Sequence, residues 1–325
     1  MRTLLALATA LFVQFVAAGH AWSQADYPSR PITMVVGAGA GGTPDLQARL
    51  FAERLAKVLK TSIAVDNRAG AGGAIAGQAA LNAPPNGYTL LWVGHSFLTI
   101  NPYVYKKFPV TLEQLQPVSN VVEVCMGYFS RPSLGPTTMK EFVAYMAANP
   151  GKVNFGNAAV GSQPHLLAEQ LLATTNTKAT LINYKSGAEI VTAIAGGFAD
   201  IYVTAISSLD IQNVQMGRLR ALATTCRGRM PQMPDVPTMT ELGYPNYVVT
   251  GTYQVFVPKG VPKEIVNKLA QAAEVVKSDP EYVAKLKDIL GAPAAEKTPE
   301  EFARWLDNER HTWSAIVDRA KVSAE

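Results

Sequence analysis

Charged and metal-binding residues are scarce in this chain of 325 residues. Charged residues make up 17% of it, and histidine occurs only four times. Beyond the N-terminal segment the histidines are His95, His165 and His311, too widely spaced for a zinc or iron site. The formal net charge is +4, with lysines and arginines scattered along the chain rather than gathered on one stretch. We therefore expect no metal, no cofactor and no nucleic-acid partner.

Cysteine is rarer still, with only Cys125 and Cys226 in the whole chain. They are far apart and form no C-x-x-C motif, so neither a dithiol centre nor a metal site is indicated. They could form one disulfide in an oxidising compartment, but sequence does not show whether their backbones come close enough. The pairing stays open at this point.

Long hydrophobic runs are missing except at the N-terminus. There Arg2 precedes an apolar run over residues 4–18, and small residues follow it. This pattern predicts a secretory signal peptide over residues 1–25, because the run is shorter than the roughly 20 residues of a membrane span. We expect the remaining chain to be a soluble protein of a bacterial periplasm.

What the chain does contain is a repeated strand, loop and helix pattern. Hydrophobic residues make up 48% of the chain, enough for a sizeable core. A short apolar run at 31–36 leads through glycines into an amphipathic helix at 46–59. The pattern returns as a strand at 152–155, a Gly/Ser loop at 156–163 and a helix at 164–173. Further strands are predicted at 61–66, 88–93, 179–184, 200–204 and 219–225. Such alternation predicts two α/β domains with largely parallel sheets.

The sharpest local motif is the first glycine loop, residues 37–42, which matches G-x-G-x-x-G between a strand and a helix. Asp66 closes the next strand, so the pattern allows an NAD-dependent oxidoreductase that uses Gly37, Gly39, Gly42 and Asp66. Export and a second glycine loop at 69–73 argue against that function. The more general property of such a loop is that backbone N–H groups at a helix start attract a small anion.

Loops at the strand ends are rich in Gly, Ala, Ser, Thr and Asn and poor in catalytic side chains, which indicates a binding protein rather than an enzyme. Several spaced motifs resemble one known family. They are YPSRPI at 27–32, NRAGAGG at 67–73, PNGYTLL at 85–91, INP at 100–102, GSQPHL at 161–166, YKSG at 184–187 and PDVPT at 234–238. The chain resembles the Bug family, the periplasmic solute-binding components of tripartite tricarboxylate transporters, over essentially its whole mature length.

This resemblance implies a fold with two α/β domains hinged around a ligand cleft, like a type II periplasmic binding protein. We expect domain 1 to comprise residues 26–125 plus 252–325 and domain 2 to comprise residues 126–251. The implied ligand is a small organic carboxylate, a di- or tricarboxylate, aromatic ones included. The implied ligand-binding residues are Gly37, Ala38, Ala40, Gly41, Gly42, Thr43, Asp45, His95, Ser96, Asn157, Ala158, Gly161, Ser162, His165, Tyr184, Thr204 and Ala205.

The sequence departs from the family pattern at two places that bear on the ligand. Ala38-Gly39-Ala40 stand where the family often has Phe-Pro-Pro, so the cleft should admit a bulkier ligand. Val203-Thr204 stand where some members carry an acid, so an ammonium group would lack a partner. We therefore expect a non-amino carboxylate.

The expected partners follow from the same resemblance. The loaded protein would deliver its ligand, as a monomer without enzymatic turnover, to the membrane components of a tripartite tricarboxylate transporter. A ligand-presenting protein that serves a sensor kinase would share every residue-level feature. That alternative and the oxidoreductase stay open at this point.

Overall fold

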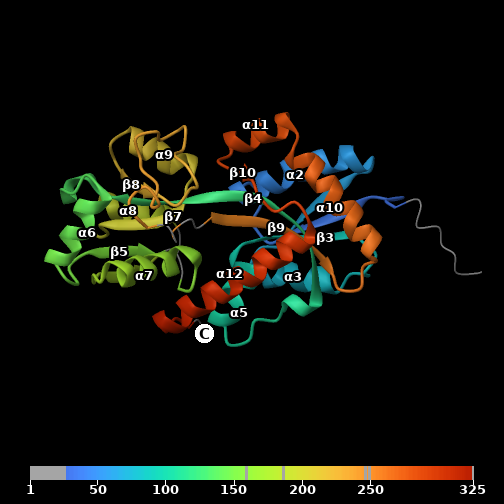
Figure 1. Ribbon diagram of the computed structural model, residues 1–325, viewed down its shortest axis with the longest axis horizontal. Helices are drawn as coiled ribbons and strands as arrows, with labels where there is room; N and C mark the ends of the chain where they lie inside the picture. Colours follow the sequence, from blue (N-terminus) through green and yellow to red (C-terminus); the bar gives the residue numbers. More distant parts are fainter. Residues whose placement is uncertain (1–26, 158–159, 185–186, 245–246, 248–249, 324–325) are drawn as a thin grey trace, which may run out of the picture.

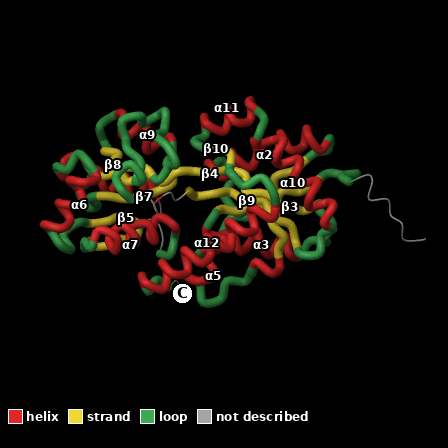
Figure 2. Tube along the Cα trace, in the orientation of Figure 1, coloured by secondary structure: helices red, strands yellow, loops and turns green. Residues whose placement is uncertain are grey.

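The computed structural model describes residues 27–157, 160–184, 187–244, 247 and 250–323. The predicted signal peptide and Ala158 lie outside these residues. The described chain is a mixed α/β fold, as predicted, in which two groups of elements lie side by side and share one long strand (Figure 1). Figure 2 shows strands in the interior of each group and helices outside them.

The first group, called the first lobe, contains one end of the sheet. Its strands are β1 (Ile32–Val36), β2 (Ile63–Asn67), β3 (Thr89–Gly94), β9 (Thr250–Pro258) and β10 (Ala292–Pro293). Its helices are α2 (Thr43–Leu59), α3 (Ala74–Leu81), α10 (Lys263–Lys277) and α11 (Pro280–Asp288). β1 pairs with β2 and β3 in parallel, whereas β9 joins β3 antiparallel.

The second group, called the second lobe, repeats the parallel arrangement. Its strands are β5 (Asn154–Asn157), β6 (Thr180–Asn183), β7 (Ile201–Ala205) and β8 (Arg220–Thr224). Its helices are α6 (Met139–Ala148), α7 (Gln163–Thr175), α8 (Gly187–Ala195) and α9 (Ser208–Gln215). β5 pairs with β6 and β7 in parallel.

Strand β4 (Leu115–Ser130) joins the two lobes. It pairs antiparallel with β9 as far as Cys125 opposite Thr250, and with β7 from Met126 opposite Ala205. The sheet order is therefore β2-β1-β3-β9-β4-β7-β5-β6, with β8 and β10 also on β4. The sheet is therefore parallel within each lobe, as predicted, but antiparallel at its centre, where β4 and β9 lie. Sequence reasoning identified neither of these two strands.

Helix α12 (Pro299–Ala320) also reaches both lobes. Its first half packs Phe302 and Leu306 into the core beside β3 and α3, and its last turns pack Trp313 and Val317 beside α7. Two short helices, α4 (Ser96–Thr99) and α5 (Asn101–Val104), lie beneath it. The predicted division into two domains stays a proposal, to which we return below.

Helix α2 shows how local sequence places a loop. Ala48, Phe51, Ala52, Leu55 and Leu59 recur at helical spacing and are all buried, so one face of the helix packs on the sheet. Pro44 stands in the first turn, where its missing N–H costs nothing, and Lys60 ends the helix in the left-handed conformation. The loop from Gly37 to Gly42 is thereby held between two fixed elements.

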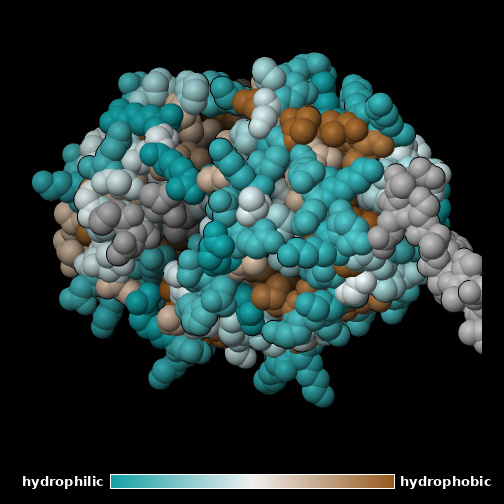
Figure 3. All heavy atoms as spheres, turned by 45° about the vertical axis from the view of Figure 1, so that its right-hand side comes forward, coloured by the Kyte–Doolittle hydropathy of each residue, from teal (hydrophilic) through white to brown (hydrophobic). Residues whose placement is uncertain are grey.

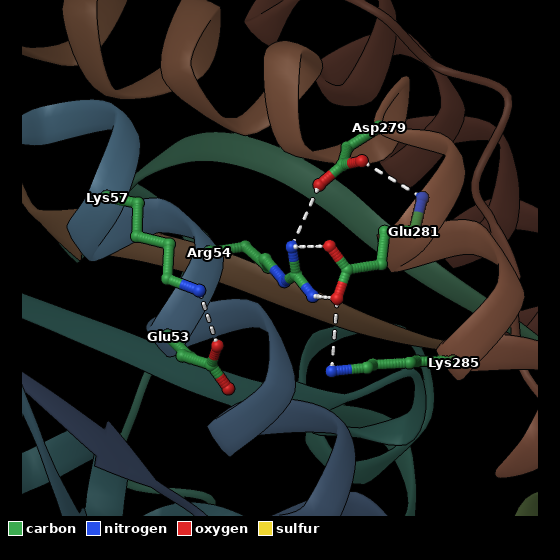
Figure 4. A network of polar contacts seen from close by, with 6 residues as sticks. All are labelled: Glu53, Arg54, Lys57, Asp279, Glu281 and Lys285. Atoms are coloured by element: carbon green, nitrogen blue, oxygen red, sulfur yellow. Dashed lines mark hydrogen bonds and ion pairs between the residues drawn. The ribbon is translucent and has the colours of Figure 1, made fainter.

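A buried arginine fastens α11 to α2 (Figure 4). The Arg54 side chain is 9% exposed; it makes a two-pronged ion pair with the Glu281 carboxylate and lies 3.4 Å from Asp279. Lys285 adds a second cation 3.2 Å from Glu281. Two nearby cations favour the ionised form of a carboxylate. The pKa of Glu281 is accordingly lowered to about 2, chiefly by the hydrogen bond from Arg54. This network joins two helices of the first lobe.

The two cysteines form a disulfide, with 5.1 Å between their Cα atoms. It ties β4 to the segment that follows β8, so the pairing that sequence left open is resolved. Within the described residues no helix is both long enough and apolar enough to cross a membrane. The face drawn in Figure 3 is mostly hydrophilic, with hydrophobic side chains in separate patches.

Candidate ligand-binding site

A cavity of about 530 Å³ lies where the two lobes face each other. That volume is within the range of about 300–1,000 Å³ usual for small-molecule sites. Both lobes line it, and so do β4 and β9, which connect them. The arrangement can therefore enclose a small molecule between two bodies.

The first lobe contributes the ends of two strands and the loops that follow them. Gly37 and Ala38 come from the loop between β1 and α2, Pro44 from the first turn of α2, and Gly72 and Gly73 from the second glycine loop. The amide of Asn101 donates to the Gly72 carbonyl oxygen at 2.9 Å and so holds that second loop against α5. Glycines at these positions leave the backbone open to close approach by a ligand.

The second lobe contributes the start of α7 and the end of β7. Gly161, Ser162, Gln163 and Pro164 line the cavity from the helix start, and Thr204 and Ala205 from the strand end. The Ser162 hydroxyl accepts from the N–H of His165 and caps the helix. Pro164 has no N–H, so the N–H of Gln163 is the first-turn donor without an intrahelical partner, at the helix end that carries partial positive charge.

The wall between these two sides is apolar and aromatic. Trp92 and Tyr253 stack at 5.9 Å with their planes 5° apart, and Val124 and Met126 project from β4. Burial raises the pKa of Tyr253 to about 12, so its phenol is neutral at physiological pH. A ligand with an apolar or aromatic body would fit against this wall.

His95 is the only side chain of the described lining that could become a cation. It is 3% exposed, and the edges of Trp305 and Trp313 pack on its ring at 5.6 and 5.7 Å. Burial lowers the pKa of His95 to about 3, so the imidazole is neutral. Nε2 lies 3.3 Å from the Glu309 carboxylate, although neither ring nitrogen has a well-aligned hydrogen bond.

The described lining contains no lysine, arginine, aspartate or glutamate. An anion in this cavity would therefore be stabilised by N–H groups and helix starts rather than by a charged side chain. The described residues also contain no cluster of three or more His, Cys, Asp or Glu side chains that could hold a metal ion.

The structure brings together eight of the predicted site residues. These are Gly37, Ala38, His95, Ser96, Gly161, Ser162, Thr204 and Ala205. Ala40, Gly41, Gly42, Thr43, Asp45, Asn157, His165 and Tyr184 do not line the cavity. Tyr184 lines a different cavity beside Phe198. Asn157 is fully buried at the end of β5, and its amide has no hydrogen-bond partner among the described residues.

Two of the predicted residues, Asp45 and His165, do not line the cavity but hold the loops in place by hydrogen bonds to backbone N–H groups. The Asp45 carboxylate accepts hydrogen bonds from Gly41 N–H, Asn67 and Arg49 at 2.8, 2.8 and 2.9 Å. Burial alone would raise the pKa of Asp45, but these hydrogen bonds lower it below its ordinary value. On the other side, Nδ1 of His165 accepts from Gly161 N–H at 2.8 Å. Burial lowers the pKa of His165, which keeps this nitrogen an acceptor.

Sequence reasoning missed the residues that β4 and β9 bring to the cavity, chiefly Val124, Met126, Thr252 and Tyr253. It also missed Trp92, Asn101 and Tyr105. Asn101 carried a signal, since it lies within the INP motif at 100–102. So did Gly72 and Gly73 in the motif at 67–73 and Gln163 and Pro164 in the motif at 161–166, which also line the cavity without having been predicted.

Comparisons with known proteins agree with one another. The sequence profile of the Tripartite tricarboxylate transporter family receptor matches residues 47–322. Protein BugT of Bordetella pertussis is 34% identical over 300 residues, covering 90% of this chain and 89% of that protein. Among solved structures, R. palustris Rpa4515 with adipate has a TM-score of 0.79 at 28% identity, covering 92% of this chain and 99% of that one. MatC from Rhodopseudomonas palustris with bound malate has a TM-score of 0.73 at 25% identity, covering 90% and 100%.

Proposed function

Because this chain belongs to the tripartite tricarboxylate transporter receptor family, as its resemblance to the Bug family predicted, we propose that it is a periplasmic solute-binding protein for a small organic carboxylate. It would deliver that carboxylate to the membrane components of a tripartite tricarboxylate transporter, acting as a monomer without turnover. The observation that carries the proposal is the cavity between the lobes, whose described lining comes largely from loops at helix starts and holds no lysine, arginine, aspartate or glutamate.

The energetics of a carboxylate suit such a cavity. Removing the ion from water costs several kcal/mol, and each charge-assisted hydrogen bond returns about 1.5–3 kcal/mol. A helix start adds about 0.3–2 kcal/mol. Donors from one loop would not balance the cost, whereas donors from both loops would. We therefore propose that binding and closure of the lobes are one event, with residues 26–125 plus 252–325 and residues 126–251 as the moving bodies.

The ligand class follows from the lining and from the bound ligands of the relatives. Adipate and malate are both dicarboxylates without an amino group. The stacked pair Trp92 and Tyr253 favours a longer or aromatic body over a short hydroxy acid. We propose a non-amino dicarboxylate, and the first-loop contacts would come from Gly37 and Ala38 rather than from Asp45.

The oxidoreductase alternative finds less support. It requires Gly39, Gly42 and Asp66 at the ligand, and none of the three lines the cavity. The Asp66 carboxylate instead pairs with Arg68 at 2.9 Å. A sensory partner remains as compatible with the cavity as a transporter. Affinity capture from membranes of the native bacterium would distinguish the two by the partner recovered.

Calorimetric titration tests the ligand class. The purified protein would be titrated with adipate, terephthalate, malate and glutamate, and with NADH as the rival ligand. We expect saturable one-to-one binding by adipate or terephthalate, weaker binding by malate and none by glutamate or NADH. Binding by NADH, or by none of the carboxylates, would contradict the proposal.

A further inference from the structure

A second cavity lies on the opposite face of the sheet from the central one. It measures about 440 Å³ and is formed where β4 passes from the first lobe to the second. Successive side chains of a strand point to opposite faces. Accordingly Val124 and Met126 line the central cavity, whereas Glu123 and Cys125 line the second, which we call the rear cavity.

Both lobes form the rear cavity. The first lobe contributes Lys287 of α11, Leu290 and Gly291 from the turn after α11, and both residues of β10. The second lobe contributes residues 226–232, which follow β8. In Figure 1, β8, α9 and α11 lie above β4, whereas α5, α7 and α12 lie below it. The rear cavity therefore lies across the junction of the lobes without sharing a lining residue with the central cavity.

The two cavities differ in charge: the described lining of the central cavity has no lysine, arginine, aspartate or glutamate, whereas the rear cavity is positively charged. Its described lining holds three cations, Arg227, Arg229 and Lys287, against one carboxylate, Glu123. The Arg227 guanidinium pairs with Glu123 at 3.2 Å, and Arg229 pairs with Glu241 at 3.0 Å. The Lys287 ammonium has no ion pair or hydrogen bond to any described residue, and it stands at the exposed rim. One cation is thus available for an external anion.

The interior of the rear cavity is apolar. The Cys125–Cys226 disulfide, Met230, Leu290 and Pro293 are part of its lining. An apolar interior with an unpaired cation at its rim matches a ligand that has an apolar body and one acidic group. A short dicarboxylate would leave its second charge against the apolar interior, which is unfavourable.

We propose that the rear cavity is a second binding site, for a small amphipathic organic anion whose acidic group pairs with Lys287. The site goes beyond the proposed function and does not depend on it, because no residue of the central cavity takes part. Occupancy of the two cavities is measured with different ligands, so failure of one proposal leaves the other standing.

Fluorescence titration with 8-anilinonaphthalene-1-sulfonate tests this site, because the dye combines an apolar body with one sulfonate. We expect saturable one-to-one binding that Lys287→Glu weakens about tenfold or more. Lys140→Glu, at an exposed lysine of α6 far from the rear cavity, is the matched control and should leave binding unchanged. Decanoate should displace the dye, and decanol of the same chain length should not.

A second variant fills the rear cavity. Gly228 lines it, has no positive φ, and a Cβ there meets nothing within 4 Å, so Gly228→Trp adds bulk without backbone strain. We expect it to abolish dye binding, while Gly187→Trp, at another glycine with open space, leaves it intact. Absence of saturable binding by the wild type would overturn the proposal, as would equal affinity in Lys287→Glu and Lys140→Glu. Unchanged binding in Gly228→Trp would also overturn it.

Discussion

The two loops that face each other across the central cavity are built on the same plan. Each follows a parallel strand and contains a glycine at positive φ, Gly41 at 81° and Gly161 at 73°. Each leads into a helix that has proline in its first turn. In each, the N–H of that glycine donates to the side chain four residues later, Asp45 or His165. In both loops this hydrogen bond fixes the backbone just before a helix start.

The loops differ in what holds them. Asp45 is charged and bonded to Arg49 and Asn67, so the first loop is fixed entirely within its own lobe. His165 is neutral, and its Nε2 lies 3.9 Å from the Glu169 carboxylate. A Cβ on Gly41 would meet nothing within 4 Å, whereas a Cβ on Gly161 would lie 2.3 Å from Cγ1 of Val104 in α5. The first loop is thus fixed in its own lobe, and the second makes the contact between α7 and α5.

The largest expected effect tests that contact. Gly161→Val would force a β-branched residue into positive φ and against Val104, at about 1–2 kcal/mol for the backbone and 1–3 kcal/mol for overpacking. Affinity for the carboxylate identified by calorimetry should fall about a hundredfold. The double variant Gly161→Val, Val104→Ala should recover part of the loss. A double variant no better than the single one would show that the contact plays no part.

The next effect concerns the first loop. Asp45→Ala removes a buried carboxylate and leaves Gly41 N–H, Arg49 and Asn67 without their acceptor, which should lower the free energy of unfolding by about 3 kcal/mol. Urea denaturation measures it. Asp45→Asn keeps the shape and one acceptor oxygen, so it should cost less. Equal losses in both variants would mean that packing, rather than the hydrogen bonds, holds the loop.

A smaller loss is expected in the second loop. His165→Ala removes one neutral acceptor from Gly161 N–H, at about 1–2 kcal/mol of unfolding free energy. The same denaturation experiment provides the measurement. A loss larger than that of Asp45→Ala would reverse the comparison between the two loops.

The smallest effect is in the pH dependence. The folded state lowers the pKa of His165 below its ordinary value of 6.5, so below that pH the unfolded chain takes up more protons than the folded one. Stability should therefore fall as the pH drops from about 7 to about 5, and it should fall more steeply in the wild type than in His165→Gln. Asp45 acts only at lower pH, since its carboxyl pKa lies below the ordinary value of 3.8. Parallel curves for the two proteins would contradict this assignment.

Local signals in the sequence predicted the strand, loop and helix units well. Proline and glycine at fixed places set the start of α2 and α7, and the periodicity of buried residues set their faces. β4 and β9 were not predicted, because polar residues, glycine and proline interrupt their apolar pattern and the two strands pair with each other over more than 100 positions. The disulfide could not be decided for the same reason, since it depends on how β4 meets the segment after β8.

The site was predicted in outline, but the direction of individual side chains was not. Asp45 and His165 belong to segments whose neighbouring residues line the cavity, yet both side chains turn back onto the loop backbone. A sequence cannot distinguish these orientations, because a carboxylate or imidazole in a first turn can bond either a loop N–H or a ligand. The aromatic wall came from strands that sequence reasoning had not identified.

A crystal structure with the bound carboxylate tests the central claim most directly. We expect one carboxylate group to accept hydrogen bonds from backbone N–H groups of both loops, at Ala38 and at Gln163, with no lysine or arginine in contact. A carboxylate held by only one loop, or paired with a cationic side chain, would contradict the account.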